Sequence, residues 1–315
     1  MITYMMKPIR LLLAAALLLL AACDKEDDPV LTPETNITAK FDPDFARHLQ
    51  ERGIIADAAH ITYADVADIT KLDISREYSD WTEGKGLTSL KGIEYFTALT
   101  ELDCHYNALT ALDLSRNTAL KELDCSGNQL TALDLSRNTA LEGLYCPGNQ
   151  LATLDVSRNT ELKWLYCYYN QLAELDLSRN TTLTALDCYS NQLTELDLSQ
   201  NTELECLYCY DNPLTALDLS LNTELTELRC HKNQLTELDL SQNTALIYLD
   251  CYGNQLAALD LSLNTELKWM DCMENPGKNG FFEVTLWPGS TLTVWKESWE
   301  YDGQAVTVKY LGKEE

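Results

Sequence analysis

The sequence predicts a mostly β protein whose coils stack into a solenoid, with short parallel strands on two faces, a small helical cap in front and an antiparallel β cap behind. Within each coil, apolar residues stand two apart, first as Leu102 and Cys104 and again as Leu112 and Leu114. Side chains two apart on an extended segment share one side, so both rows point into a common core. A unit of 21 residues repeats without insertion, with starts at Leu99, Leu120, Leu141, Leu162, Leu183, Leu204, Leu225 and Leu246.

The repeat pattern identifies a family. Its first half reads L-x-x-L-x-C-x-x-N-x-L, which resembles leucine-rich repeats with Cys at one inward Leu position. Its second half, from Leu109 to Asn117, nearly repeats the first and is similar to the nested bacterial class called IRREKO repeats. Two Asn columns, Asn107 to Asn275 and Asn117 to Asn264, mark the bends, because Asn tolerates left-handed backbone and its amide satisfies turn groups.

The start of the chain predicts export and a lipid anchor. A basic segment and an apolar run too short to span a bilayer are typical of a signal peptide over residues 1–22. Leu20-Ala21-Ala22-Cys23 resembles a bacterial lipobox, in which Cys23 carries the lipid. The acidic stretch 23–40 is expected to be a solvated tether. Its acidic cluster resembles the surface-export signal of some Gram-negative lipoproteins, which implies outer-membrane anchoring and surface exposure; an ordinary secretory signal and a periplasmic location are the alternatives.

The front of the stack needs a cap, because a coil cannot leave its core open to water. Residues 41–86 are expected to form it, with a helical pattern around Pro43 to Gln50 and a second one after Thr62. Internalin-type proteins resemble this arrangement. The repeats themselves define a solenoid over residues 87–275.

The back of the stack is expected to be covered by residues 276–315. Apolar and polar residues alternate from Phe281 to Tyr310, and Pro288-Gly289 and Asp302-Gly303 are turn signals. Two or three antiparallel strands follow from this pattern. An independent binding domain is the alternative for the same segment.

Composition excludes several classes of protein. The 315 residues include 49 acidic and 23 basic side chains, for a formal charge of −26, whereas nucleic-acid binding needs clustered Lys and Arg. The four His form no pairing with a nucleophile, and neither a phosphate loop nor a metal cluster is evident. A shallow repeat face also lacks an enclosed pocket. We therefore expect neither an enzyme nor a cofactor.

The cysteines form an inward column rather than a metal site, since they stack along a ladder instead of converging. We expect buried free thiols that act as small apolar groups. Cys206 and Cys209 stand three apart and face opposite sides of a strand, which excludes a zinc or redox pair. The column comprises Cys104, Cys125, Cys146, Cys167, Cys188, Cys209, Cys230, Cys251 and Cys272.

A second column is acidic and points outward from the second half of each coil. Arg116, Arg137, Arg158 and Arg179 accompany its first four members and offset their repulsion. Divalent-cation binding along the column is one hypothesis, and a solvated face bonded to nearby Ser and backbone groups is the other. The column comprises Asp113, Asp134, Asp155, Asp176, Asp197, Asp218, Asp239 and Asp260.

Aromatic residues flank the inward Leu and Cys of the first strand, so they point outward. The core does not need them, and contiguous outward rings on a repeat face indicate a contact surface. The sequence suggests an interruption of the rings at Glu227, Arg229 and His231. The alternative is that the rings only stabilise neighbouring strands by stacking. The candidate ligand-binding residues are Tyr145, Trp164, Tyr166, Tyr168, Tyr189, Tyr208, Tyr210, Tyr248, Tyr252 and Trp269.

Together these features predict a monomeric, lipid-anchored surface protein that uses its aromatic strand face to bind another protein, in adhesion or host interaction. Family resemblance implies protein recognition more often than sugar binding. A glycan-binding alternative would use Trp164, Tyr166 and Tyr208 as stacking platforms. A passive acidic spacer without a ligand is the remaining alternative.

Overall fold

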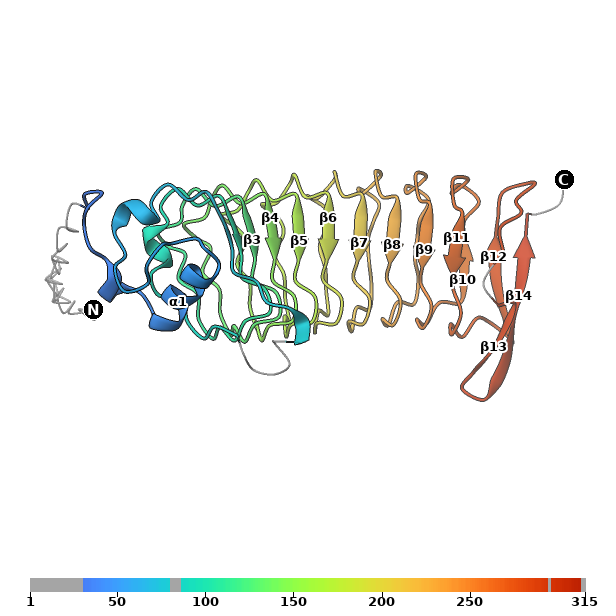
Figure 1. Cartoon of the computed structure of the whole chain (residues 1–315). Coiled ribbons are helices and arrows are strands. Elements are labelled where there is room, and N and C mark those ends of the chain that lie inside the picture. The colour runs from blue at the N-terminus through green and yellow to red at the C-terminus, as the bar shows by residue number, and fades with distance from the viewer. Residues whose placement is uncertain (1–30, 80–85, 294–295, 313–315) are drawn as a thin grey trace, which may run out of the picture.

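The computed structural model describes residues 31–79, 86–293 and 296–312. The described part is an elongated stack of coils with helix α1 (Pro43–Glu51) near one end and strands β12 to β14 at the other (Figure 1). The predicted signal peptide, the lipobox with Cys23 and the first part of the tether lie outside the described residues. Among the residues that are described, no helix is long and apolar enough to cross a bilayer.

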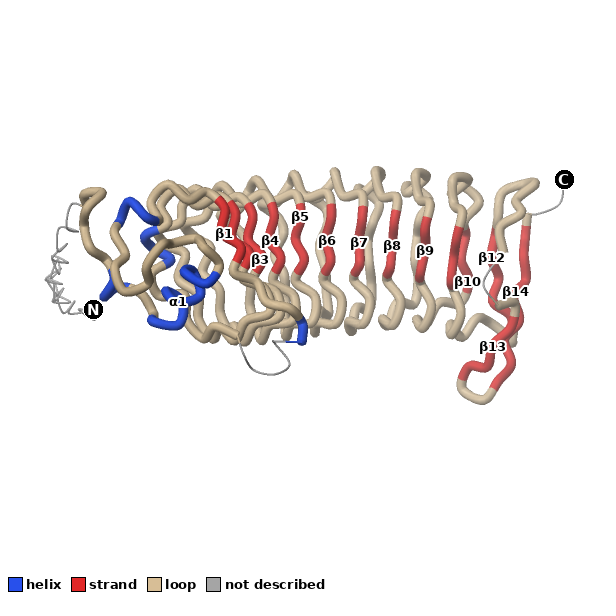
Figure 2. Tube along the Cα trace, in the orientation of Figure 1, coloured by secondary structure: helices blue, strands red, loops and turns tan. Residues whose placement is uncertain are grey.

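One parallel sheet of ten strands runs along the rod (Figure 2). Each strand has three residues, and its central Leu or Met is buried while the two flanking residues point outward, on the side that we call the first face. The sheet begins with β1, inside the range predicted as the front cap. Its strands are β1 (Lys71–Asp73), β2 (Glu101–Asp103), β3 (Glu122–Asp124), β4 (Gly143–Tyr145), β5 (Trp164–Tyr166), β6 (Ala185–Asp187), β7 (Cys206–Tyr208), β8 (Glu227–Arg229), β9 (Tyr248–Asp250) and β11 (Trp269–Asp271).

Register follows the repeat. Leu144 pairs with Leu165, and Leu165 with Leu186, so each residue lies beside its counterpart one coil away. A property that recurs every 21 residues therefore becomes a continuous column along the rod, about 4.8 Å per step.

The outward side of the second half-coil, which we call the second face, is organised differently. Its Leu residues are buried as predicted, but in the described residues it forms a strand only in the last coil, as β10 (Ala258–Asp260). The expected second ladder is therefore confined to that coil. β10 has the same bond from the Ser262 amide to Asp260 as the other coils, and it differs in having β12 beside it as a pairing partner. In the first coil the Ser115 amide donates to the Asp113 carboxylate, and the Leu114 carbonyl accepts from the Asn117 amide and the Asn138 side chain. These backbone groups are satisfied without strand pairing.

The core is a set of Leu rows beside the cysteine column, and all nine of those Cys are fully buried. Both Asn columns are buried as well, and their amides bond the backbone at the bends. Asn128, for example, donates to the carbonyls of Cys104 and Cys125 and accepts from the Leu109 amide. The bonding predicted for the Asn amides is confirmed, whereas the left-handed backbone at the first bend belongs to the residue before each Asn, such as Gly148 before Asn149.

The front cap contains the first predicted helix. Asp42 accepts from the amides of Asp44 and Phe45 at the start of α1, which buries Phe45 and Leu49. The second helical pattern yields only a short 3₁₀ turn, η2 (Tyr63–Asp65), whose capping box joins Thr62 and Asp65. Two further 3₁₀ turns are η1 (Thr38–Lys40) and η3 (Ile93–Tyr95).

Residues 31–40 differ from the solvated tether that the composition predicts. Ile37 is 2% exposed and belongs to the core of the front cap. Its amide donates to the Ile61 carbonyl, and the Tyr63 amide donates to the Thr35 carbonyl. Ile37 in the core, Leu31 packed against it and these backbone bonds place the stretch on the front cap, although the average composition of the stretch is polar.

The back cap continues the second face. β12 (Phe281–Thr285) pairs in parallel with both β10 and β14 (Gln304–Leu311), and Phe282 and Val284 seal the last coil. Only β13 (Ser298–Tyr301) and β14 are antiparallel, joined at Asp302-Gly303 with φ of 47° and 73°. The hairpin is confirmed, whereas β12 follows the direction of the coils because it extends their open edge.

Candidate binding surface

All ten predicted aromatic residues lie on the first face, and each is half-buried. They occupy three positions of the coil: the first residue of a strand, the last residue, and the residue two places after it. These positions hold, in that order, Trp164, Tyr248 and Trp269; Tyr145, Tyr166 and Tyr208; and Tyr168, Tyr189, Tyr210 and Tyr252. Their location is settled by the ladder, and their role in binding remains a prediction.

Five rings of the third position form a continuous stack, which we call the ring stack. Centroids are 4.4 Å apart for Tyr168 and Tyr189, and 4.1 Å apart for Tyr189 and Tyr210. His231 then lies 4.1 Å from Tyr210 and 4.7 Å from Tyr252, with all four pairs within 15° of parallel. The sequence interpretation of His231 as an interruption is therefore wrong, because an imidazole stacks in this column as a phenol does.

Arg229 does not interrupt the surface either. Its guanidinium carbon lies 4.7 Å from the ring centre of Tyr208 and 5.0 Å from that of Tyr248, within cation–π range of both. Glu227 holds it in place, accepting from Nε at 3.0 Å and from Nη2 at 2.7 Å. Beyond it, Tyr248 stacks on Trp269 at 4.2 Å.

Two buried carboxylates lie among the rings, and sequence reasoning missed both. Asp187 and Asp250 are each 9% exposed. Asp250 Oδ2 lies 3.1 Å from His231 Nδ1, whereas Asp187 Oδ1 has no hydrogen-bond partner among the described residues. Burial raises the pKa of Asp187 to about 7, against the opposing effects of the Tyr189 amide and Arg229. The spacing of 21 between Tyr166, Asp187 and Tyr208 was the signal that could have revealed this carboxylate.

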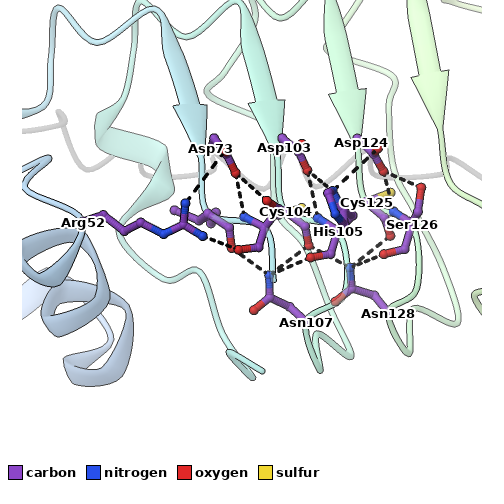
Figure 3. Close-up of polar contacts among 12 residues, drawn as sticks. Arg52, Asp73, Asp103, Cys104, His105, Asn107, Asp124, Cys125, Ser126 and Asn128 are labelled. Atoms are coloured by element: carbon purple, nitrogen blue, oxygen red, sulfur yellow. Dashed lines mark hydrogen bonds and ion pairs between the residues drawn. The ribbon is translucent and has the colours of Figure 1, made fainter. Parts of the chain in front are cut away.

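The front of the first face is acidic (Figure 3). His105 Nδ1 lies 2.6 Å from Asp103 Oδ1 and 3.9 Å from Asp124 Oδ2, and one ligand atom from each of the three fits within 4.8 Å of the others. Burial raises the pKa of Asp124, whose Oδ1 accepts from Ser126. These three side chains could hold a metal ion. No metal site was predicted here from the sequence, although Asp103-x-His105 followed by Asp124 one repeat later was the available signal.

The chain resembles known leucine-rich-repeat proteins in both sequence and fold. The family of leucine-rich repeats (two copies) matches residues 97–138. The functional domain of InlJ from Listeria monocytogenes, which includes a cysteine ladder, matches with a TM-score of 0.64 and 37% identity over 77% of this chain. The fold is a leucine-rich-repeat solenoid.

Other solved leucine-rich-repeat structures agree on the fold. A leucine-rich-repeat protein of Leptospira interrogans has a TM-score of 0.60 and 23% identity over 69% of this chain and 67% of its own. Internalin C2 of Listeria monocytogenes has a TM-score of 0.55 and 23% identity over 81% of this chain and 98% of its own. The present chain spans 57% of the InlJ domain. No curated protein sequence matches it.

The cysteines of this leucine-rich-repeat solenoid are free thiols in the described residues, as predicted. Burial raises the pKa of Cys209 to about 12, so its thiolate is scarce at neutral pH. Cys206 is half-buried on the first face while Cys209 is fully buried, so the two face opposite sides of the strand. The exclusion of a zinc or redox pair is consistent with that placement.

The acidic column of the second face is exposed and locally bonded. Asp176 accepts from the Ser178 amide at 2.9 Å, and bonds from Ser178 hold the pKa of this carboxyl below its usual value. The same bond recurs in each coil. Within the described part of the chain, no three carboxylates of this column come within 4.8 Å of one another, so the column does not supply a three-ligand cation site. The solvated-face interpretation fits these contacts.

Proposed function

We propose that this leucine-rich-repeat solenoid is a protein-recognition module that binds its partner through the aromatic first face. Leucine-rich-repeat solenoids are typically interaction scaffolds rather than enzymes, and their stacked coils present extended binding surfaces. The observation that carries the proposal is the line of half-exposed rings from Tyr145 to Trp269. The core is already filled by the Leu rows and the cysteine column, so packing alone does not require these rings. We assign no catalytic step to the surface.

Ring geometry favours a protein over a glycan as the ligand. A sugar stacks on an open ring face, but the inner faces of the ring stack are covered by the neighbouring rings at 4.1 to 4.7 Å. Tyr208 is likewise covered on one side by Arg229. Within the ring stack, what remains accessible on the inner rings is their edges and hydroxyl groups, which suit the mixed apolar and polar surface of a protein.

The competing hypothesis is a spacer in which stacking only stabilises the rod. The test is binding of the protein to arrays of extracellular proteins and of glycans, with a variant carrying Trp164→Ala, Tyr166→Ala and Tyr208→Ala. A second variant, Leu221→Ala with Leu263→Ala, removes side chains that are 53% and 55% exposed elsewhere on the coils and serves as the control.

We expect a protein ligand that is lost in the ring variant and retained in the control, with both variants folded by circular dichroism. Glycan binding that depends on the same rings would mean that the ligand of this surface is a glycan and not a protein. Absence of any ligand for the wild type would favour the spacer.

We further propose that the chain is held at the outer membrane by a lipid on Cys23 and faces outward. The support is the lipobox and the acidic residues that follow it. Cys23→Ala should abolish incorporation of a labelled fatty acid and move the protein from the membrane to the soluble fraction. Cleavage by protease added to intact cells would support surface display, and protection would favour the periplasmic alternative.

A further inference from the structure

Asp187 is a buried carboxylate in an aromatic setting. It is the last residue of β6, and its register partners on the two sides are Tyr166 of β5 and Tyr208 of β7. It is 9% exposed, and its Oδ1 is buried without a hydrogen-bond partner among the described residues. An unpaired buried acceptor is unfavourable, and a buried charge is more so, so an Asp at this position requires an explanation.

The same face contains a complete version of this arrangement two strands away. There the Glu227 carboxylate binds the Arg229 guanidinium through Nε and Nη2, and the guanidinium lies against the rings of Tyr208 and Tyr248. Carboxylate, guanidinium and two tyrosines thus form one unit. At Asp187 the carboxylate and the two tyrosines are present, and the guanidinium is missing.

Neighbouring groups do not complete the unit. Arg229 influences Asp187 electrostatically, and its Nε and Nη2 donate to Glu227 rather than to Asp187. The other titratable groups whose pKa values are affected by Asp187 are phenols and thiols. Burial raises their pKa values, so these groups stay neutral near pH 7. These groups are Tyr166, Tyr168, Tyr189, Tyr210, Cys167, Cys188 and Cys209.

We propose that Asp187, together with Tyr166 and Tyr208, forms the docking point for an arginine side chain of a protein partner. A guanidinium suits this point because it is planar, stacks on aromatic rings and donates two parallel hydrogen bonds to one carboxylate. The rings of Tyr166 and Tyr208, the register partners of Asp187, are half-exposed, so rotation of their side chains admits a planar group. The formal charge of −26 attracts a basic partner over a longer range. This inference rests on the proposed function and names the chemistry of its partner.

The test uses the full-length protein and a small probe, the acetyl-Gly-Arg-Gly-amide peptide, with the citrulline peptide as an uncharged analogue of the same shape. Binding is followed by NMR of the tyrosine and Asp187 signals at about 0.15 M salt, where long-range attraction is largely screened. The variant is Asp187→Asn, which keeps the shape of the side chain. The matched control is Asp176→Asn, which removes the same charge from the exposed second face.

We expect the wild type to bind the arginine peptide and not the citrulline peptide. Asp187→Asn should weaken binding about tenfold, the usual consequence of losing a charged hydrogen-bond partner, whereas Asp176→Asn should change it less than about twofold. Equal losses in both variants would mean general attraction to an acidic protein and would overturn the inference. So would a wild type that does not bind the arginine peptide.

The experiments distinguish failure of the proposed function from failure of the arginine docking point. A protein partner that depends on the rings but binds Asp187→Asn as tightly as wild type would keep the proposed function and overturn the arginine docking point. Arginine binding that depends on Asp187, with no protein partner on any array, would keep the docking point and argue against the proposed function.

Discussion

The two halves of each coil start from nearly the same sequence and end as different surfaces. Both halves bury their apolar pair, so the core does not distinguish them. On the first face the backbone pairs between coils, and the outward residues become columns of rings. On the second face an Asp–Ser bond closes each segment locally, and the outward residues are exposed carboxylates. The two surfaces therefore differ through their outward residues and their backbone pairing, and not through the inward pattern.

The two Asn columns show the same difference inside the protein. Asn170, in the first column, donates to the carbonyls of Cys146 and Cys167, and its Oδ1 accepts from the Leu151 amide. Asn159, in the second column, donates to two carbonyls, but its Oδ1 has no partner among the described residues. Each Asn of the first column thus bonds to more backbone groups than an Asn of the second column does.

The largest expected effect compares these two columns. Asn170→Ala leaves the buried Leu151 amide without a partner and removes one of the two side-chain bonds that each of the Cys146 and Cys167 carbonyls accepts. It should lower the free energy of unfolding by about 3 kcal/mol. Asn159→Ala removes two bonds and an already unpaired oxygen, so it should cost about 1–2 kcal/mol. Urea denaturation of both variants measures the difference. Equal losses in the free energy of unfolding would show that the two Asn columns contribute equally to stability.

Ionisation should act with opposite signs on the two faces. The folded-state pKa of Asp187 is raised by burial to about 7, so the wild type loses stability as the pH rises from about 4 to 7. Asp187→Asn cannot ionise and should be more stable than wild type by about 2 kcal/mol at pH 8, with a smaller difference at pH 5.

Asp176 provides the comparison. Its pKa is lowered by bonds from Ser178, so it contributes stability above pH 4 that is lost as the pH falls through its folded-state pKa. Asp176→Asn should therefore be less stable than wild type at both pH 5 and pH 8. Denaturation at the two pH values tests both signs, and a stabilised Asp176→Asn would contradict the local-bond interpretation.

The ring stack should contribute to stability as well as to binding. Tyr189 stacks on both Tyr168 and Tyr210, and each ring pair contributes about 0.5–1.5 kcal/mol. Tyr189→Ala should therefore lower the free energy of unfolding by about 1.5 kcal/mol. Leu221→Ala, away from the stack, should change it by less than about 0.5 kcal/mol. Thermal melts of the two variants give the comparison, and similar melting temperatures would exclude a stabilising stack.

The smallest expected effect concerns the bend that follows the first face. The residue before each first-column Asn has a positive φ, which is 63° at Gly148 and 52° at Tyr169 and Lys232. A Cβ at Gly148 meets neighbours no closer than 3.6 Å, so Gly148→Ala should cost only the left-handed backbone term, about 1 kcal/mol. Lys232→Gly should show a change of opposite sign and smaller size. Both are measured by urea denaturation.

Much of the candidate surface could be predicted because the register is simple. Tyr166, Asp187 and Tyr208 are spaced by one repeat, so their adjacency follows from the sequence once the ladder is accepted. What the pattern did not reveal is that His231 continues the stack and that Arg229 bridges two tyrosines. Residue type alone suggested an interruption, since it carries no information on how a side chain orients against the next coil.

The sequence by itself determined the repeat length, the inward rows, the two bends and the outward position of the rings. Each of these depends on local geometry: a period of two on an extended segment and Asn at each turn. Only the tertiary structure decided that the second face forms a strand in one coil, beside the back cap, that Ile37 belongs to the core, and that Asp187 Oδ1 is buried without a partner among the described residues. Those outcomes depend on contacts between residues at least 20 positions apart, where burial, stacking and competing hydrogen bonds select among arrangements that local pattern leaves equivalent.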